Sequence, residues 1–257
     1  MSRLLATSRH RAILRRLEEA GTATVEELAA ALGVSRETIR RDLKHLAAGG
    51  HLAIVHGGAV HERRSEAPLA ERRASNAAGK EAIARTALSF VEDGMTVLLD
   101  SGTTAEAVAE ALARSERARL SLHTTSLASA RIVGRLPGAR VFLVGGEYDR
   151  EDDATAGPEA LRAISRLSAD LAFVGVGGVS EAGIVTDYTR AAAATRSALI
   201  GAASRCYFLA DRTKFGRNLP SAVAAQDSAA GLLADSAPAP SIGTALAARQ
   251  LRLILSV

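Results

Sequence analysis

The chain has 257 residues, enough for one large domain or two smaller ones, and 47% of them are apolar and 23% charged. These proportions are typical of a globular protein, so they exclude a chain that is disordered, collagenous or coiled-coil throughout. Charges interrupt every apolar stretch well before the roughly 20 residues that cross a bilayer, and the N-terminus lacks the apolar segment of a secretory signal. The single cysteine, Cys206, excludes an internal disulfide and favours a reducing cytoplasm as the location.

The positive charge is concentrated at one end of the chain. Residues 1–64 contain 11 Lys and Arg against 7 Asp and Glu, so this quarter carries the whole formal net charge of +4. The asymmetry predicts an N-terminal module that meets a polyanion, attached to a neutral body. On charge alone, an ordinary solvated basic surface explains the pattern equally well.

Two helices are predicted first. Residues 13–17 carry the apolar stripe of one helix, and Gly21 is expected to end it. Thr24 and Glu27 have the spacing of a capping box, in which each residue's side chain binds the other's backbone N–H. A second helix is therefore expected to begin near Val25.

A third helix follows a tight turn at Gly33. Ser35 is a good N-cap residue for a helix that runs toward Ala48. Residues spaced i, i+4 and i+7 face the core, and these are Ile39, Leu43 and Leu46. The opposite face of the helix is charged and mostly basic, and it carries Glu37, Arg40, Arg41 and Lys44.

This arrangement is the helix-turn-helix pattern, in which the second helix of the pair fits the major groove of DNA. A strand-like segment over 52–56 and a turn at Gly57-Gly58 would form a wing beside it. The alternative is a small helical domain with a solvated charged face.

The rest of the chain alternates helix and strand. Strands are predicted at 96–99, 120–123, 140–144, 171–174, 207–209 and 251–255, with Ala-rich helical stretches between them. Alternation of this kind predicts an α/β fold with an open, mostly parallel sheet covered on both faces. We expect a DNA-binding domain over 1–60, a linker over 61–75 and an α/β domain over 76–257, with 234–241 as a plain loop.

Ligands of open parallel sheets bind beyond the carboxyl ends of the strands. One predicted strand ends in Asp100-Ser101-Gly102-Thr103-Thr104, which offers a glycine for close backbone approach, hydroxyl groups and a helix N-terminus. These features predict a site for a phosphate or carboxylate, although an N-capped helix without a ligand has the same pattern. Other strands end in 124–126, 145–146, 175–178 and 211–216.

Lysine is rare in this chain, with three lysines among 32 basic residues. Lys214 follows Asp211 in one of the strand-end loops, where a compact point charge suits an anion, although drift explains an occasional lysine as well. The segment 175–180 resembles a dinucleotide fingerprint but lacks its last glycine, so no nicotinamide site is expected. Asp152 and Asp153 are interpreted as a solvated loop, and Cys206 as a core residue. We expect no cofactor, no metal and no catalytic residue.

The sequence resembles the DeoR-type family of bacterial transcriptional regulators of sugar metabolism from about residue 9 to 257. The string V-S-R-E-T-I-R-R-D-L at 34–43 is highly specific to that family. Further matches are Leu46, Gly50, 56–59, Arg72, Asn76, Lys80, 83–84, Gly94, 100–104, 145–146, Gly157, Asp170, Asp211 and 214–216.

The resemblance implies a winged helix-turn-helix reader joined to a sensor related to ribose-5-phosphate isomerase and CoA-transferase folds. It implies an oligomer that binds double-stranded operator DNA under the control of a small phosphorylated sugar. The expected DNA-binding residues are Ser35, Arg36, Thr38, Arg40, Arg41, Lys44 and His56. The expected effector-binding residues are Asp100, Ser101, Gly102, Thr103, Thr104, Gly145, Gly146, Asp211 and Lys214.

Some positions depart from the family pattern. Ile54 stands where an arginine usually precedes the wing histidine, which puts one phosphate contact in question. Ala194 and Arg196 replace a usual Glu and Lys, and Ala234 replaces the Thr of a Thr-Asp pair, which leaves open an unusual effector. The function expected is that of a regulator, most simply a repressor. The alternative is an isomerase or CoA-transferase-like enzyme with Asp100 or Asp211 as its base and an accessory DNA-binding domain.

Overall fold

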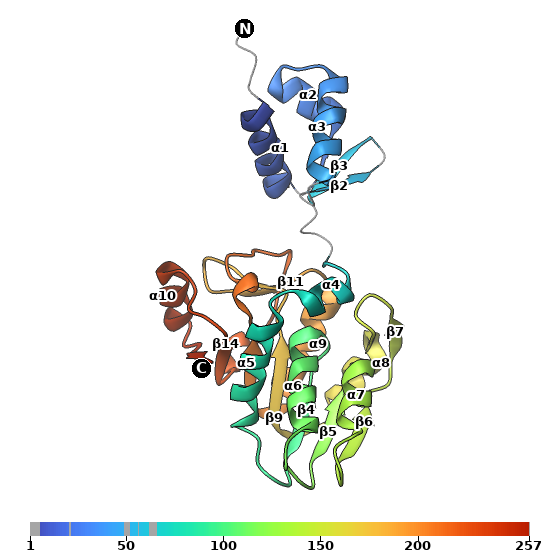
Figure 1. The fold of residues 1–257 in the computed structure, drawn as a ribbon, viewed down its shortest axis with the longest axis vertical. Helices are drawn as coiled ribbons and strands as arrows, with labels where there is room; N and C mark the ends of the chain where they lie inside the picture. The colour runs from blue at the N-terminus through green and yellow to red at the C-terminus, as the bar shows by residue number, and fades with distance from the viewer. Residues whose placement is uncertain (1–5, 21, 49–51, 56, 62–65, 257) are drawn as a thin grey trace. The chain divides into compact units, whose positions relative to one another are not determined.

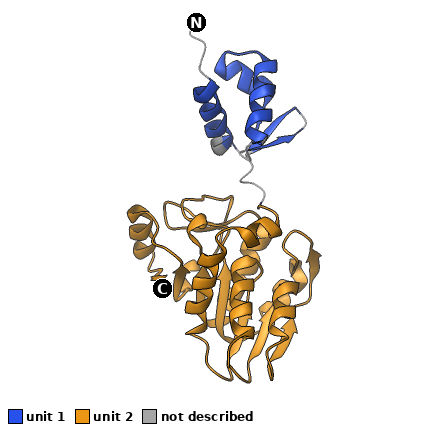
Figure 2. Ribbon diagram, viewed as in Figure 1, with its two compact units in different colours: residues 1–66 blue, residues 67–257 orange. Residues whose placement is uncertain are grey.

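The computed structural model divides into two compact units, residues 1–66 and 67–257, which Figure 2 colours separately. The structure describes residues 6–20, 22–48, 52–55, 57–61 and 66–256.

The described residues of unit 1 form three helices and a small antiparallel sheet. The helices are α1 (Ala6–Ala20), α2 (Val25–Leu32) and α3 (Arg36–Ala48), and the strands are β1 (Thr22–Thr24), β2 (Leu52–Val55) and β3 (Gly58–His61). The strand order is β1-β3-β2. Strand β1 was not expected from the sequence. Its three residues are too few to show an alternation of apolar and polar side chains, and they pair with β3, far along the chain.

The local rules that predicted these helices are confirmed. The Thr24 N–H donates to the Glu27 carboxylate at 2.9 Å and the Glu27 N–H donates to the Thr24 hydroxyl at 3.2 Å, so the capping box starts α2 at Val25. Gly33 has a φ of 64°, a left-handed conformation that favours glycine. Ile39, Leu43 and Leu46 are at most 4% exposed and pack in the core of the unit. Gly21, the expected end of α1, lies outside the described residues, and α1 ends at Ala20.

Unit 2 is built on a seven-stranded sheet in which every neighbouring pair is parallel. Its strands are β4 (Thr96–Leu99), β5 (Ser121–Thr124), β6 (Arg140–Leu143), β9 (Ala169–Gly175), β12 (Ala203–Leu209), β14 (Gly231–Ala234) and β15 (Leu253–Leu255). The helices are α4 (Leu69–Ala74), α5 (Ala77–Leu88), α6 (Thr103–Ala113), α7 (Leu127–Val133), α8 (Gly157–Ile164), α9 (Arg190–Gly201) and α10 (Pro240–Ala248). The expected α/β fold with a parallel sheet is thus confirmed (Figure 1).

Two smaller sheets lie outside the main one. Strands β7 (Glu147–Asp149) and β8 (Ala154–Ala156) form a hairpin, while β10 (Gly178–Val179), β11 (Val185–Asp187) and β13 (Ser221–Ala222) form a three-stranded sheet. None of these short strands was expected. Each has only two or three residues, so the local sequence has too little alternation of apolar and polar residues to reveal it.

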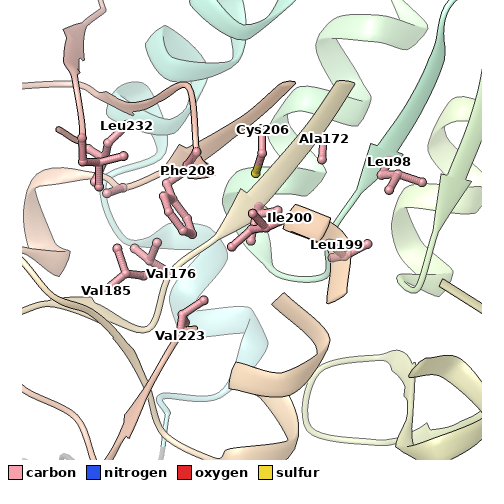
Figure 3. Packing of buried hydrophobic residues seen from close by; sticks show 14 of the residues in the cluster. Leu98, Ala172, Val176, Val185, Leu199, Ile200, Cys206, Phe208, Val223 and Leu232 are labelled. Atoms are coloured by element: carbon pink, nitrogen blue, oxygen red, sulfur yellow. The ribbon is translucent and has the colours of Figure 1, made fainter. Parts of the chain in front are cut away.

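The sheet separates two apolar layers because successive side chains of a strand point to opposite faces. Val97, Leu99 and Phe173 pack in one layer with residues of α5, α6 and α7. Leu98 and Ala172 point the other way and pack with residues of α8, α9 and α10. Figure 3 shows this second layer, with Cys206 and Phe208 facing Ile200 of α9. Cys206 is 1% exposed, which confirms its place in the core.

The expectation that 234–241 is a plain loop is wrong at both ends. Ala234 is the last residue of β14, which pairs with β12 and β15, and α10 begins at Pro240. The strand was missed because it is only four residues long and starts with Gly231, which weakens a local strand pattern. Proline is compatible with the first turn of a helix, so Pro240 starts α10 and does not interrupt it.

Candidate functional site

The surface of α3 is basic where the sequence predicted it to be. The side chains of Arg36, Arg40 and Arg41 are 65%, 59% and 80% exposed, and Lys44 is exposed as well. Ser35 caps the helix: its hydroxyl accepts the Thr38 N–H at 3.2 Å and lies 2.9 Å from the Thr38 hydroxyl. The helix therefore presents cations outward from a buried apolar stripe, which is the geometry that suits the major groove.

Acidic neighbours hold these arginines only weakly. Arg36 lies 3.2 Å from Glu26, and Arg40 and Arg41 lie 3.9 and 3.6 Å from Glu37. Exposed ion pairs of this kind contribute roughly 0–1 kcal/mol each, because solvent screens them. A phosphate group can therefore replace either carboxylate at little cost in stability.

A buried carboxylate fastens α3 to α1. The Arg9 Nη2 and the His10 Nε2 each lie 2.9 Å from the Asp42 Oδ1. Burial by itself would raise the pKa of Asp42, but the hydrogen bonds from Arg9 and His10 hold it below its ordinary value. Asp42 belongs to the family string, and the structure places it on the inner side of α3, where it orients the helix.

The wing stands beside α3 and is apolar at its tip. In the β2–β3 hairpin Val55 pairs with Gly58, and Ile54 and Val55 are 51% and 45% exposed. A groove of about 330 Å³ separates the hairpin from the helices. Its lining is Val25, Glu26, Arg40, Leu43, Lys44, Ile54, Val55, Gly57 and Gly58. His56, the expected wing contact, lies outside the described residues.

In unit 2 the order of the main sheet reverses between β4 and β9. From β4 the chain moves outward through β5 and β6, and it then returns to β9 on the other side of β4. Ligands of open α/β sheets bind beyond the carboxyl ends of the strands at such a switch point. The segment 100–104 follows β4 directly, so the structure places it at this position.

This segment forms an open helix N-terminus. Gly102, the N-cap residue of α6, has a φ of 99°, which few residues other than glycine adopt, and no side chain caps the helix. Ser101, Gly102 and Thr103 are partly exposed, whereas Thr104 is 7% exposed. Backbone N–H groups at a helix N-terminus attract anions, so 101–103 form a cradle that solvent reaches.

Asp100 lies beneath this cradle and is bound within the protein. It is 1% exposed, and its Oδ2 accepts the Gly175 N–H at 3.0 Å and lies 3.2 Å from Arg196 Nε. Arg196, on α9, also pairs with Asp187 and donates to the Gly175 carbonyl at 2.9 Å. Burial raises the pKa of Asp100 to about 6, which the charge of Arg196 partly offsets. A buried chain of two carboxylates and one guanidinium thus ties β4, β9 and β11 together at the switch point.

Sequence reasoning missed the role of Arg196 in linking the buried carboxylates of Asp100 and Asp187. It was noted only as a departure from the family pattern, because one partner, Asp100, is 96 positions away after β4, and the other, Asp187, is nine residues away but on a different element, β11. The alternation of strands and helices does not show which distant side chains meet.

A second polar cluster lies at the same carboxyl-terminal ends of the strands. The Asn76 amide donates to Asp235 at 2.8 Å and to Asp211 at 3.4 Å. Lys80, 5% exposed, donates to the Ser75 carbonyl at 2.7 Å and to the Arg72 carbonyl. Burial lowers the pKa of Lys80, an effect that the Asp211 carboxylate partly offsets, and Lys214 and Glu106 are also close enough to act on it.

The remaining residues expected to bind the effector are spread along the carboxyl-terminal ends of the strands. Asp211 is 2% exposed and caps the short turn that contains Lys214, which is partly exposed. Gly145 and Gly146 are exposed after β6, two strands away from β4 and hence roughly 10 Å to the side. Asp152, which was interpreted as part of a solvated loop, is 23% exposed and also pairs with Arg72 of α4, whose Nη2 lies 2.6 Å from its carboxylate.

Within the described residues, no group of three or more His, Cys, Asp or Glu side chains is placed to hold a metal ion. No helix of the described chain is both long and apolar enough to span a membrane.

The two units define a class of protein. A winged helix-turn-helix unit with a basic recognition helix, joined to an open parallel α/β unit with an uncapped helix N-terminus at its switch point, is a DNA-binding regulator with a sensor. The DeoR-like helix-turn-helix domain matches residues 9–64, and the DeoR C terminal sensor domain matches residues 75–236. The chain belongs to the DeoR family of transcriptional regulators.

The relatives include both a repressor and an activator of transcription. The glycerol-3-phosphate regulon repressor of Escherichia coli (strain K12) is 32% identical over 213 residues, which cover 82% of this chain and 84% of the relative. The L-fucose operon activator of the same organism is 28% identical over 235 residues, which cover 90% of this chain and 96% of the relative.

Among solved structures, ribose 5-phosphate isomerase A from Methanocaldococcus jannaschii is similar, with 19% identity and a TM-score of 0.41 over 55% of each chain.

Proposed function

We propose that this protein represses genes of carbohydrate metabolism by binding double-stranded operator DNA, and that a small phosphorylated sugar in unit 2 controls its affinity. The observation that carries the proposal is the open helix N-terminus at 101–103, set at the switch point of the sheet in a chain whose other unit is a DNA reader. The name of the glycerol-3-phosphate regulon repressor supports a phosphorylated effector.

On the DNA side, the exposed cations of α3 would neutralise phosphates and release counterions, which supplies most non-specific affinity. Side chains near the N-terminus of α3 would contact base edges and give specificity. We assign these roles to Arg36, Thr38, Arg40, Arg41 and Lys44, with Ser35 as the cap and His56 as a wing contact.

On the effector side, the backbone and hydroxyls of 101–104 would bind the phosphate. Lys214 would supply a positive charge, and Asp211 would orient the turn that carries it. Asp100 supports the cradle from below, because its carboxylate already binds the Gly175 N–H and Arg196. Gly145 and Gly146 would border the site at its far end.

This use of Asp100 also argues against catalysis. A general base must reach the proton that it removes, and Asp100 is buried beneath the cradle with its Oδ2 already engaged. We therefore propose that the chain needs no catalytic residue and no cofactor. Turnover of pentose phosphates by the purified protein would contradict this.

The test is a thermal-shift screen of sugar phosphates with the full chain. A ligand at about 100 times its dissociation constant adds roughly 2.7 kcal/mol to the free energy of unfolding. The compound that raises the melting temperature should also change the affinity for the protein's own promoter fragment. Lys214→Ala should abolish both effects while DNA binding persists, and Arg212→Ala, an exposed neighbour, is the matched control.

A Lys214→Ala variant that still binds the compound and responds to it normally would contradict the site. A wild-type protein that responds to no anionic metabolite would contradict the proposed control.

We further propose that the chain functions as a homo-oligomer, since a symmetric assembly brings several readers to one operator.

A further inference from the structure

Large apolar side chains are exposed at one edge of the main sheet. Among the described residues of unit 2, the large apolar side chains exposed are Phe142 at 37%, Leu143 at 47%, Tyr148 at 54% and, on the opposite edge strand β15, Leu255 at 47%. The first three lie within seven consecutive residues, on β6 and on β7, the next strand of the chain. Single exposed apolar residues are common, but a cluster of them marks an interaction surface.

The cluster lies on an edge strand. In the main sheet β6 pairs with β5 alone, and Figure 1 shows it at the end of the sheet. The outer side of an edge strand presents backbone N–H and C=O groups that can pair with another strand. Parallel sheets, moreover, are normally buried on both faces.

Neither face of this edge is fully covered, since Leu143 is exposed on one face and Phe142 on the other. Val141 and Leu143 point toward the face that carries α7, where Val141 packs against the apolar layer. Phe142 points to the other face, where its ring stacks on His123 at 4.5 Å and the Arg140 guanidinium lies 5.1 Å from the ring centre. Neither Phe142 nor His123 belongs to the apolar layer that α8, α9 and α10 complete on that face.

We propose that β6 is the interface of a homodimer, in which β6 of one copy pairs antiparallel with β6 of a second copy of this chain about a two-fold axis. This deepens the proposed function, because it rests on the proposal that the chain is a homo-oligomer.

The symmetry fixes which residues meet. A two-fold axis normal to the sheet keeps each face on its own side, so opposite residues come from the same face. With the axis at Phe142, Phe142 lies opposite Phe142 of the second copy, and Val141 lies opposite Leu143. The three apolar residues of β6 then meet only apolar residues, and the sheet continues across both copies.

The charges on either side of β6 favour the same arrangement. Arg135 and Arg140, both exposed, lie before and at the start of the strand, and Glu147 and Asp149 follow its end. With the axis at Phe142, Arg140 lies opposite Val144, three residues before Glu147 of the second copy, so the basic start of one copy lies toward the acidic segment of the other. Parallel pairing would bring Arg140 beside Arg140 of the second copy, and two like charges side by side are unfavourable.

A disulfide cross-link tests the geometry directly. Opposite residues of an antiparallel pair have Cα atoms roughly 4.5–5.5 Å apart, which a disulfide can span. Phe142→Cys is made in a Cys206→Ser background, and Leu255→Cys is the matched control, an exposed apolar residue on the opposite edge strand. We expect Phe142→Cys to give a covalent dimer under mild oxidation and Leu255→Cys to remain uncross-linked.

A mass measurement tests the energetics. Sedimentation of the full chain should show a dimer or a multiple of it, and Phe142→Glu should weaken the dimer by roughly 30-fold or more, as expected for a central contact. Leu255→Glu should leave the assembly unchanged. Circular dichroism and the thermal shift with a sugar phosphate show whether Phe142→Glu is folded, and if it is not, the cross-link decides.

The proposal is overturned if the wild-type protein is monomeric, if Phe142→Glu is folded and keeps the wild-type mass, or if Leu255→Cys cross-links in preference to Phe142→Cys. A monomer that still prefers its own promoter would overturn the interface and leave DNA binding intact. A wild-type dimer that binds its own promoter no better than random DNA would instead overturn the proposed function.

Discussion

The two units use arginine in opposite ways. On α3 the arginine side chains are 59–80% exposed and lie 3.2–3.9 Å from carboxylates that solvent also reaches. At the switch point of unit 2, Arg196 is 6% exposed and lies between two buried carboxylates, Asp100 and Asp187. Charges in the first setting can exchange partners, whereas those in the second hold the fold. Substitutions should therefore separate: those on α3 change affinity, and those at the switch point change stability.

The largest effect is expected at Arg196. Arg196→Met leaves Asp100 and Asp187 buried without their common cation, and removal of one partner from a buried ion pair costs about 3–5 kcal/mol. The free energy of unfolding, measured with denaturant, should fall by that amount. Arg196→Lys is the control: it keeps a charge but cannot reach both carboxylates in the same way, so its loss should be smaller. A loss below about 1 kcal/mol for Arg196→Met would show that the ion pairs of Arg196 with Asp100 and Asp187 do not hold the fold.

A pH dependence is the next largest effect. Because the pKa of Asp100 is raised to about 6, above the value of about 3.9 in an unfolded chain, its protonated form stabilises the fold. That contribution is complete below pH 4 and is lost as the pH rises through 6, and it amounts to about 3 kcal/mol. The difference in unfolding free energy between wild type and Asp100→Asn should shrink by up to this amount between pH 4 and 7. A difference that does not change with pH would contradict the assignment.

On α3, Arg41→Ala should weaken DNA binding and leave the fold intact. If Arg41 neutralises one phosphate, the slope of log affinity against log salt should fall by about 1, for specific and random DNA alike. The free energy of unfolding should change by less than about 0.5 kcal/mol, because the side chain is 80% exposed. Anisotropy titrations at several salt concentrations measure the slope. An unchanged slope would remove Arg41 from the phosphate contacts.

The smallest effect is expected at the wing. Ile54, 51% exposed, is the position at which the resemblance to the family led us to expect an arginine. Ile54→Arg should steepen the same salt slope by about 1 if the wing lies along a phosphate. Ile54→Gln, which is similar in length and uncharged, is the control. If both variants behave as wild type, the wing tip does not approach the backbone of DNA.

The sequence predicted what depends on local rules. The capping pair Thr24–Glu27, the N-cap Ser35 and the buried stripe of α3 follow from spacing alone, because a helix brings residues of fixed separation together. The position of 100–104 also followed, because it needed only a strand before it and a helix after it.

What the sequence did not reveal depends on contacts between distant segments. Arg196 meets Asp100 across 96 positions of the chain, and Asn76 meets Asp235 across 159. Strand β14 was missed for the same reason, since its neighbours β12 and β15 define it more than its four residues do. Such pairings follow from the order of the sheet, which alternation of strands and helices does not fix.

The most direct test of the account is the affinity of the full chain for its own promoter fragment, measured against random competitor DNA with and without the sugar phosphate that stabilises it. The account predicts a clear preference for the promoter and a change in that preference when the sugar phosphate is added. Equal binding to promoter and random DNA under both conditions would contradict it.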